Sequence, residues 1–288
     1  MTYFVTGATG HLGAHVLAQL SQVIPAGQII AGARSPDKAR AVVPAGIEVR
    51  AFDYDRPETL AAALRGVQKL LLISGNDFVN PRFIQHRAVI AAAQQAGVGL
   101  VAYTSILHAA TSRIGLAVDH QKTEQALAES GIPHVLLRNG WYNENYAESL
   151  GGALASGVFL GAGKEGRVAP AARADYAAAA VKVLTEEGHA GKIYELAGDR
   201  AYTLPDVAAA IATASGRDIR YQDLPEAEYS ATLQKFGVPA SIADALANAD
   251  SGLARGELDD ETHTLSRLIG RATTPLLDSF RAALSKNA

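Results

Sequence analysis

The sequence predicts an α/β protein built on a doubly wound parallel sheet, followed by a smaller α/β region. Short β-rich runs alternate with helical patterns along the first half of the chain, as they do in a series of β-α-β units. The first of these runs leads directly into a glycine-rich turn. The chain has 288 residues, of which 48% are hydrophobic, so it can fill one large α/β core or two smaller ones.

Six strands and the helices between them account for the first half. The fourth strand is apolar throughout, which is typical of a strand covered by helices on both faces. Pro57 stands where a helix starts, and Gly97 and Gly131 stand where helices end. The expected strands span residues 3–6, 28–33, 48–52, 69–73, 100–105 and 133–138. The expected helices follow Gly10 and Pro57 and span residues 39–43, 81–96 and 117–130, which is the order of a Rossmann-type fold.

Beyond Asn139 the strands become shorter and the pattern less regular. Residues 1–140 are expected to form a Rossmann domain and residues 141–288 a smaller substrate-binding region packed on it, with parts that contribute back to the first domain. Ligands of open α/β sheets bind at the carboxyl ends of the strands, so this region is expected to cover that edge. Its expected elements are strands at 157–160, 193–196 and 219–224, helices at 173–187 and 204–215, and a helical tail from Thr262 that breaks at Pro275.

Composition excludes several kinds of partner and site. Lys and Arg number 26 against 29 Asp and Glu, without a long run of one sign, so no nucleic-acid partner is expected. The absence of Cys excludes disulfides, thiolate nucleophiles and Cys-ligated metals. No apolar segment reaches the roughly 18 residues of a membrane span, and the start of the chain has no basic region of a signal peptide. We therefore expect a cytoplasmic protein without a membrane partner, of unknown oligomeric state.

No metal site is expected either. His11 and His15 stand four residues apart on the first helix, but the chain lacks the Glu and the third ligand that accompany such a pair in metalloproteases. Residues 259–261, with His263, are better explained as the N-terminal turn of a helix, where carboxylates cap the chain and complement the helix dipole.

The glycine-rich turn predicts a dinucleotide site. Its glycines are spaced three and three between a strand and a helix whose apolar residues recur at helical spacing. Such glycines permit a tight turn and a close approach of the backbone to a pyrophosphate, whose charge then lies at the helix N-terminus. The residues assigned to this contact are Gly7, Ala8, Thr9, Gly10, His11, Leu12 and Gly13.

Arg34 follows the second strand, where NAD-binding folds usually carry an acidic residue. No Asp or Glu occurs between Gln28 and Pro36. A guanidinium at this place can bind a 2′-phosphate through a charge-assisted hydrogen bond worth roughly 1.5–3 kcal/mol. We therefore expect NADPH rather than NADH as the cofactor. Asp53 and Tyr54, after the third strand, are expected to meet the adenine, although an Asp at this place also forms turns.

Several stretches together resemble the NmrA-like atypical short-chain dehydrogenase/reductases. They are GATGHLG at the start, Arg34, Tyr103-Thr104-Ser105 in the fifth strand, LRNGWYNEN from Leu137 to Asn145, and ARADY at 172–176. The resemblance runs nearly end to end, and within the family it is strongest to the bacterial NAD(P)H:quinone oxidoreductases. It implies a Rossmann domain that carries NADPH, a smaller C-terminal domain that closes the substrate cleft, and hydride transfer directly to the acceptor without a flavin.

The usual acid catalyst of short-chain dehydrogenases, a Tyr-x-x-x-Lys pair, is absent. The helix after the fifth strand carries His120 and Glu124 instead. His120 is either a proton donor or a solvent-facing helix residue, and Ser105 is either part of the active site or a cap at the strand end. The loss of the pair fits a quinone reductase, since a quinone needs no strong general acid, or an inactive NADP(H)-sensing regulator. The overall resemblance favours the reductase. A reductase that uses a lysine base is a weaker third alternative, because no lysine stands in the right place.

Two further stretches are expected to surround the cofactor and the quinone. Ser74, Gly75 and Asn76 end the fourth strand and are expected to line the ribose and the nicotinamide side. The stretch after the sixth strand is expected to surround the nicotinamide, with Tyr142 and Asn143 as the catalytic polar groups that face the acceptor. The aromatic residues Trp141, Tyr142 and Tyr146 either stack on a planar acceptor or pack the core. The residues assigned to this second stretch are Arg138, Asn139, Gly140, Trp141, Tyr142 and Asn143.

Overall fold

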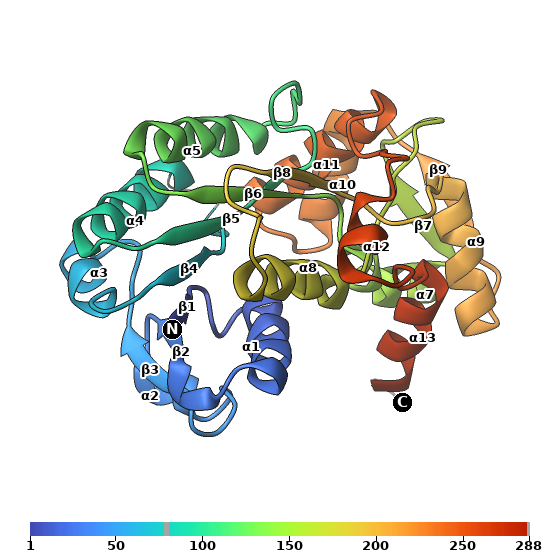
Figure 1. The fold of residues 1–288 in the computed structure, drawn as a ribbon. Coiled ribbons are helices and arrows are strands. Elements are labelled where there is room, and N and C mark those ends of the chain that lie inside the picture. The colour runs from blue at the N-terminus through green and yellow to red at the C-terminus, as the bar shows by residue number, and fades with distance from the viewer. Residues whose placement is uncertain (78–80, 287–288) are drawn as a thin grey trace. The chain divides into compact units, whose positions relative to one another are not determined.

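The computed structural model, which describes residues 1–77 and 81–286, contains a seven-stranded sheet and a separate two-stranded sheet (Figure 1). The larger sheet has the strand order β3-β2-β1-β4-β5-β6-β8. The pairs formed among its first five strands are parallel. This order reverses between β1 and β4, as in a doubly wound sheet, so the predicted fold class is confirmed. The strands are β1 Tyr3–Val5, β2 Ile29–Ala33, β3 Glu48–Ala51, β4 Lys69–Leu72, β5 Leu100–Ile106, β6 His134–Asn139 and β8 Ile193–Leu196.

Helices cover both faces of the larger sheet. They are α1 His11–Val23, α2 Pro36–Arg40, α3 Pro57–Ala63, α4 Arg82–Ala96, α5 Ala117–Ser130 and α8 Arg173–Thr185, with a short 3-10 turn at Ala26–Gln28. In Figure 1, α3, α4 and α5 lie on one face, and α1 and α8 on the other. Phe4, Leu70, Val89 and Leu127 belong to the apolar core between the sheet and the first group of helices, and all four are fully buried. Burial on both faces explains why these strands lack polar alternation.

Two predicted elements are placed differently in the structure. The helix expected at 39–43 is α2, which begins earlier because Pro36 occupies its first turn and fixes a helical φ there. The strand expected at 193–196 in the smaller region is β8, and it extends the larger sheet beside β6. At this edge the amide of Leu136 donates to the carbonyl of Lys192 at 3.0 Å. A four-residue strand with a single buried residue, Leu196, carries no sequence signal for the sheet it joins.

The chain divides into two compact units whose segments alternate along the sequence. Unit 1 comprises Met1–Ile106, Asp119–Arg138 and Tyr176–Tyr194, and unit 2 comprises Leu107–Val118, Asn139–Asp175 and Glu195–Ala288. The sequence predicts one boundary near residue 140, with parts of the second region returning to the first. In the structure, segment Tyr176–Tyr194 belongs to unit 1. The membership of Leu107–Val118 in unit 2 is not foreseen, because this loop has neither helical nor strand periodicity.

Unit 2 holds the two-stranded sheet and most of the later helices. Strand β7, Val158–Gly161, pairs in parallel with β9, Arg220–Asp223. The helical tail is interrupted around Pro275, as predicted. The helices of this unit are α6 Asn143–Ala147, α7 Leu150–Ser156, α9 Leu204–Ser215, α10 Glu226–Lys235, α11 Ala240–Ala254, α12 Thr264–Ile269 and α13 Leu276–Lys286. Within the described residues, no helix combines the length and the apolar character needed to cross a bilayer.

Candidate active site

The glycine-rich turn connects β1 to the N-terminus of α1. Gly7 has a φ of +57°, a conformation that glycine adopts without strain. A Cβ on Gly13 would lie 2.2 Å from the carbonyl oxygen of Gly7, so only glycine allows this contact between helix and turn. Gly10 is the N-cap of α1, where no side chain caps the amides and the first turn holds no acidic residue. Uncapped amides and an unopposed helix dipole suit an anion, so the turn fits a pyrophosphate.

The other residues predicted for this contact differ in exposure. Thr9 and His11 are exposed, while Ala8 and Leu12 are buried. The amide of Ala8 donates to the carbonyl of Gly32 at 3.3 Å, so it holds the turn against β2. The side chains available to a ligand at this turn are therefore those of Thr9 and His11.

Arg34 lies directly after β2 and is exposed. Its guanidinium makes no hydrogen bond or ion pair with the described part of the chain. The position therefore fits an anionic ligand such as a 2′-phosphate. Asp53 forms a local turn, since its Oδ1 accepts a hydrogen bond from the amide of Asp55 at 3.1 Å. The Tyr54 hydroxyl lies 2.6 Å from the carbonyl oxygen of Ile73, a tie to the end of β4 that the sequence does not predict.

The three residues predicted at the end of β4 lie on a tightly bonded stretch of main chain. The amide of Ser74 donates to Thr104 Oγ1 and that of Gly75 donates to His86 Nε2, both at 2.9 Å. Asn76 is exposed. Sequence reasoning missed Thr104 and His86 as members of this site, although the position of Thr104 near the end of a strand is a usable signal.

The polar groups of α5 are engaged within unit 1. His120 is 5% exposed, so it is not the solvent-facing residue that the sequence allowed. Its Nδ1 lies 2.8 Å from the hydroxyl of Tyr103, and burial, the largest cause, lowers the pKa of His120 well below its usual value. His120 is therefore a neutral, buried imidazole. Its position on the α5 face that also carries Glu124 and Leu127 is the sequence signal for this burial.

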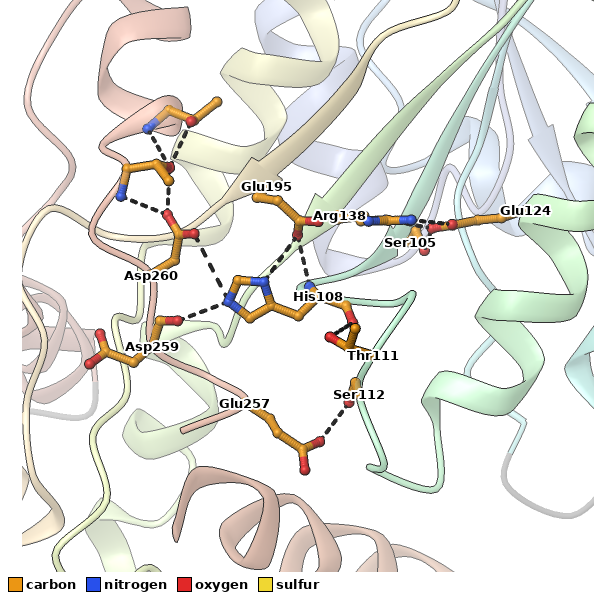
Figure 2. Close-up of polar contacts among 12 residues, drawn as sticks. Ser105, His108, Thr111, Ser112, Glu124, Arg138, Glu195, Glu257, Asp259 and Asp260 are labelled. Atoms are coloured by element: carbon orange, nitrogen blue, oxygen red, sulfur yellow. Dashed lines mark hydrogen bonds and ion pairs between the residues drawn. The ribbon is translucent and has the colours of Figure 1, made fainter. Parts of the chain in front are cut away.

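Glu124 links Ser105 and Arg138, as Figure 2 shows. The Ser105 hydroxyl donates to Glu124 Oε1 at 2.6 Å. Arg138 donates Nε to Oε1 at 3.0 Å and Nη2 to Oε2 at 2.7 Å, a bidentate pair that is largely buried. The Ser105 hydroxyl thus already donates its hydrogen bond to the Glu124 carboxylate. The Arg138 side chain holds the end of β6 to α5.

The stretch from Asn139 to Asn143 belongs to unit 2. Asn143 is fully buried, and its Nδ2 donates to the carbonyl of Thr274 at 3.1 Å and to Ser279 Oγ at 3.0 Å, so this side chain anchors α6 to the last helix. The amide of Gly140 donates to the carbonyl of Leu196 at 2.8 Å. The Tyr142 hydroxyl accepts from Asn139 Nδ2 at 3.4 Å, and burial raises the pKa of Tyr142.

Two motifs of the resemblance meet at Tyr142. The guanidinium carbon of Arg173 lies 5.0 Å from the centre of the Tyr142 ring, within the range of a cation–π contact. The amide of Arg173 donates to both carboxylate oxygens of Glu144 at 3.0 and 3.1 Å. The segments around residues 142 and 173 are therefore held together by these contacts.

The aromatic residues around Tyr146 pack the interior of unit 2. The Tyr146 ring lies 6.4 Å from that of Trp141 and 6.0 Å from that of Phe159, measured between centroids. Asp250 of α11 is buried near them, and its Oδ2 accepts from the amide of Ala162 at 2.9 Å. Burial, followed by the nearby charge of Asp223, raises the pKa of Asp250 to about 7. The packing interpretation of this cluster therefore holds for Tyr146, and the buried acid beside it has no signal in the sequence.

The acidic segment 259–261 is not the N-terminal turn of a helix, because α12 begins only at Thr264. Asp260 Oδ1 instead accepts from the amide of Thr262 at 2.9 Å. In Figure 2, His108 is surrounded by acceptors from this segment and from β8. Its Nε2 lies 2.9 Å from the carbonyl oxygen of Asp259, and its amide donates to Glu195 Oε2 at 2.7 Å. The acidic segment therefore contacts the loop that carries His108, within unit 2. Among the described residues, no group of three or more His, Asp or Glu side chains is placed to hold a metal ion.

Comparison with known proteins matches this geometry to a family. A family model described as NAD(P)H-binding matches residues 7–187. Quinone oxidoreductase 2 of Escherichia coli K12 is 52% identical over 283 residues, which cover 98% of this chain and 99% of that protein. The crystal structure of the NADPH-dependent quinone oxidoreductase of E. coli in complex with NADPH matches with a TM-score of 0.95 and 51% identity, covering 98% of this chain and 100% of that one.

Two more distant relatives extend the comparison. The crystal structure of triphenylmethane reductase of Citrobacter sp. complexed with NADP(H) matches with a TM-score of 0.91 and 37% identity, covering 98% of this chain and 100% of that one. An NmrA-like family domain-containing oxidoreductase of Aspergillus flavus is 28% identical over 296 residues, which cover 100% of this chain and 96% of that protein. The chain therefore belongs to the NmrA-like family of NAD(P)H-binding proteins.

Proposed function

We propose that this protein is an NADPH-dependent quinone oxidoreductase that reduces a quinone to a hydroquinone in one two-electron step. The observation that carries the proposal is its 52% identity, over nearly the whole of both chains, to Quinone oxidoreductase 2 of E. coli. The uncapped N-terminus of α1 and the exposed guanidinium of Arg34 support the choice of NADPH. No flavin is required.

The residues of unit 1 are assigned to the cofactor. The turn from Gly7 to Gly13 holds the pyrophosphate, Arg34 holds the 2′-phosphate, and Ser74 to Asn76 line the ribose and the nicotinamide side. Bound NADPH supplies the hydride. The role of the chain is to bind the cofactor and the acceptor in an orientation that favours hydride transfer.

The proton balance explains why the Tyr-x-x-x-Lys pair is dispensable. The quinone takes up one hydride and one proton and becomes the hydroquinone, and NADP⁺ is released. The oxygen that receives the proton is phenolate-like and much less basic than the alkoxide of an alcohol dehydrogenase, so a strong general acid is unnecessary. This agrees with α5, where His120 and Glu124 are both bound to buried partners in unit 1.

Tyr142 and Asn143 are assigned to the acceptor side. A hydrogen-bond donor near the quinone oxygen stabilises the charge that develops there. The Tyr142 hydroxyl is the better candidate for this donor, because it accepts a hydrogen bond from Asn139 Nδ2 at 3.4 Å and burial raises its pKa, which keeps the phenol protonated. Both amide protons of Asn143 are used within unit 2, so its contribution is to fix the start of α6 next to Tyr142.

The test is NADPH oxidation by the purified protein with a soluble benzoquinone, followed at the nicotinamide absorbance. NADH is assayed in parallel, and a blank without protein corrects for the direct reaction of NADPH with the quinone. The expected result is protein-dependent oxidation that prefers NADPH. If NADPH binds but several quinones give no turnover above the blank, the reductase assignment fails and the regulatory alternative takes its place.

A further inference from the structure

Three consecutive main-chain amides at the end of β4 all donate to side chains of unit 1. The amide of Ile73 donates to Thr6 Oγ1, that of Ser74 to Thr104 Oγ1, and that of Gly75 to His86 Nε2, each at 2.9 Å. Thr6 directly follows β1, and Thr104 lies in β5. These two strands flank β4 in the sheet. The main chain is therefore fixed residue by residue where it leaves the sheet.

Gly75 is held at both of its polar groups by one helix. Its amide donates to His86, and its carbonyl oxygen accepts from Arg82 Nη1 at 3.4 Å. His86 and Arg82 are four residues apart on α4 and so share one face of the helix. A Cβ on Gly75 would lie 2.8 Å from Oε1 of Gln85, a third side chain of the same helix.

The bond from Gly75 determines the tautomer of His86. Because Nε2 accepts the amide proton, the ring proton of the neutral imidazole must be on Nδ1. Nδ1 lies 3.0 Å from Thr123 Oγ1, whose own hydroxyl donates to the carbonyl of Asp119 at 2.7 Å, so Thr123 is free to accept from Nδ1. Both ring nitrogens thus have partners, and burial, followed by the charge of Arg82, lowers the pKa of His86 to about 3.

The His86 imidazole cannot be protonated while it keeps the hydrogen bond from the Gly75 amide. A proton on Nε2 would face the amide proton of Gly75, so the bond exists only with neutral His86. The ring is fully buried, and it packs between Tyr54 and Tyr103 with ring centroids 6.3 and 5.5 Å away. With Gly75 at Nε2 and Thr123 at Nδ1, the imidazole lies with Nε2 facing the chain after β4.

We propose that His86 is a positioning residue for NADPH binding, which acts by holding the Gly75 amide and with it the main chain of residues 74–76. The inference rests on the proposed function, which assigns these residues to the ribose and nicotinamide side of the cofactor. It adds a residue of α4 that acts through the main chain of residues 74–76. Loss of one such buried hydrogen bond is expected to weaken NADPH binding about tenfold.

Two polar substitutions separate the two ring nitrogens. In His86→Gln the longer amide reaches the place of Nε2 and can accept from Gly75, whereas in His86→Asn the shorter amide reaches only the place of Nδ1 and Thr123. We expect calorimetric titration with NADPH to give a dissociation constant about tenfold higher for His86→Asn and within about twofold of wild type for His86→Gln. The KM for the benzoquinone should stay unchanged in both. Equal dissociation constants for the two variants would overturn the inference.

A control and a second measurement keep the test independent of folding and of turnover. Val89→Ala removes a fully buried side chain of α4 and should lower the melting temperature without changing the NADPH dissociation constant. Amide hydrogen exchange in the wild-type protein should be at least tenfold slower at Gly75 than at the exposed Asn76, and equal rates would overturn the inference even if His86→Asn does not fold. If NADPH binds as expected but no quinone is reduced, the proposed function fails, while the binding and exchange results still decide the role of His86.

Discussion

Unit 1 and unit 2 treat their buried polar groups in different ways. Around the end of β4, the groups of Thr6, Thr104 and His86 are paired with main-chain amides. In the interior of unit 2, the hydroxyl of Tyr146 and Oδ1 of Asn143 have no hydrogen-bond partner among the described residues. Gln85 Oε1 is the comparable atom in unit 1.

This difference separates a preorganised region from one with unused hydrogen-bonding capacity. Polar groups that satisfy one another hold a single geometry, which is what the binding of a rigid cofactor needs. A buried polar atom without a partner costs about 1–3 kcal/mol of stability, so unit 2 carries a penalty that unit 1 largely avoids. Asp250 adds to this penalty when it is charged, because burial disfavours its carboxylate form.

The largest expected effect concerns Asp250 and the pH dependence of stability. Its pKa is raised from the usual 3.8 to about 7 in the folded protein, so the folded state binds more protons than the unfolded state between these values. The stability that the protonated carboxyl provides is therefore present below about pH 4 and is lost as the pH rises towards 7. Asp250→Asn, which can still accept from Ala162, should remove this loss, up to about 4 kcal/mol at pH 8. Urea unfolding of both proteins at pH 5 and pH 8 measures it, and an identical pH dependence would contradict the assignment.

Gly13→Ala should break the preorganised region. The added Cβ would lie 2.2 Å from the carbonyl oxygen of Gly7 and 3.0 Å from the Cα of Ala8, and both are main-chain atoms that move only with the turn. We expect NADPH affinity to fall about 100-fold, or about 2.7 kcal/mol. Gly27→Ala is the matched control, because its Cβ would meet nothing within 4 Å. Calorimetric titration gives both affinities, and similar values for the two variants would show that the turn is not the pyrophosphate site.

Arg34→Ala tests an exposed cofactor contact whose side chain lies outside the hydrogen-bond network at the end of β4. Removing the guanidinium should weaken NADPH binding roughly tenfold to thirtyfold, leave NADH binding unchanged and leave the melting temperature unchanged. The ratio of kcat/KM for NADPH to that for NADH measures the effect. An unaltered ratio would mean that another group binds the 2′-phosphate.

Different measurements should distinguish Tyr142 from Asn143 in unit 2, and the effect of Tyr142→Phe on catalysis is the smallest of those expected. Tyr142→Phe removes only a hydroxyl and should lower kcat/KM for the quinone about threefold to fivefold with little change in stability. Asn143→Ala removes two hydrogen bonds to the C-terminal segment and should lower the free energy of unfolding by about 1–3 kcal/mol. Steady-state kinetics and urea unfolding of both variants separate the two roles. The opposite pattern would exchange the assignments.

The parts that the sequence predicted are those determined by local chemistry. The Gly7 to Gly13 turn needs small residues at fixed spacing, and Pro57 fixes a helix start, so a single segment contains the information. The apolar strands of the parallel sheet are likewise predicted by the residues of each strand alone. The position of Arg34 at the end of β2 follows from the same pattern once the strand is identified.

The parts that the sequence did not predict depend on contacts between distant segments. His86 acquires its role only because Gly75 and Thr123 come to its two ring nitrogens. Asp250 is one of many acidic residues on a helical pattern. Its hydrogen bond with Ala162 joins residues 88 positions apart, so no local pattern predicts its burial. Strand β8 is short and has a single buried residue, so only its pairing partner identifies the sheet to which it belongs.

The interleaved order of the segments has a consequence for folding during synthesis. The first five strands are contiguous in Met1–Ile106, but unit 1 also needs Asp119–Arg138 and Tyr176–Tyr194. The Lys69 ammonium donates to the carbonyl of Leu184 across 115 residues, and such nonlocal contacts form late. At about 5–20 residues per second, a ribosome exposes the edge of the incomplete sheet for several seconds before β8 emerges. Chaperone dependence in this protein should therefore concentrate in the interval between synthesis of β6 and synthesis of β8.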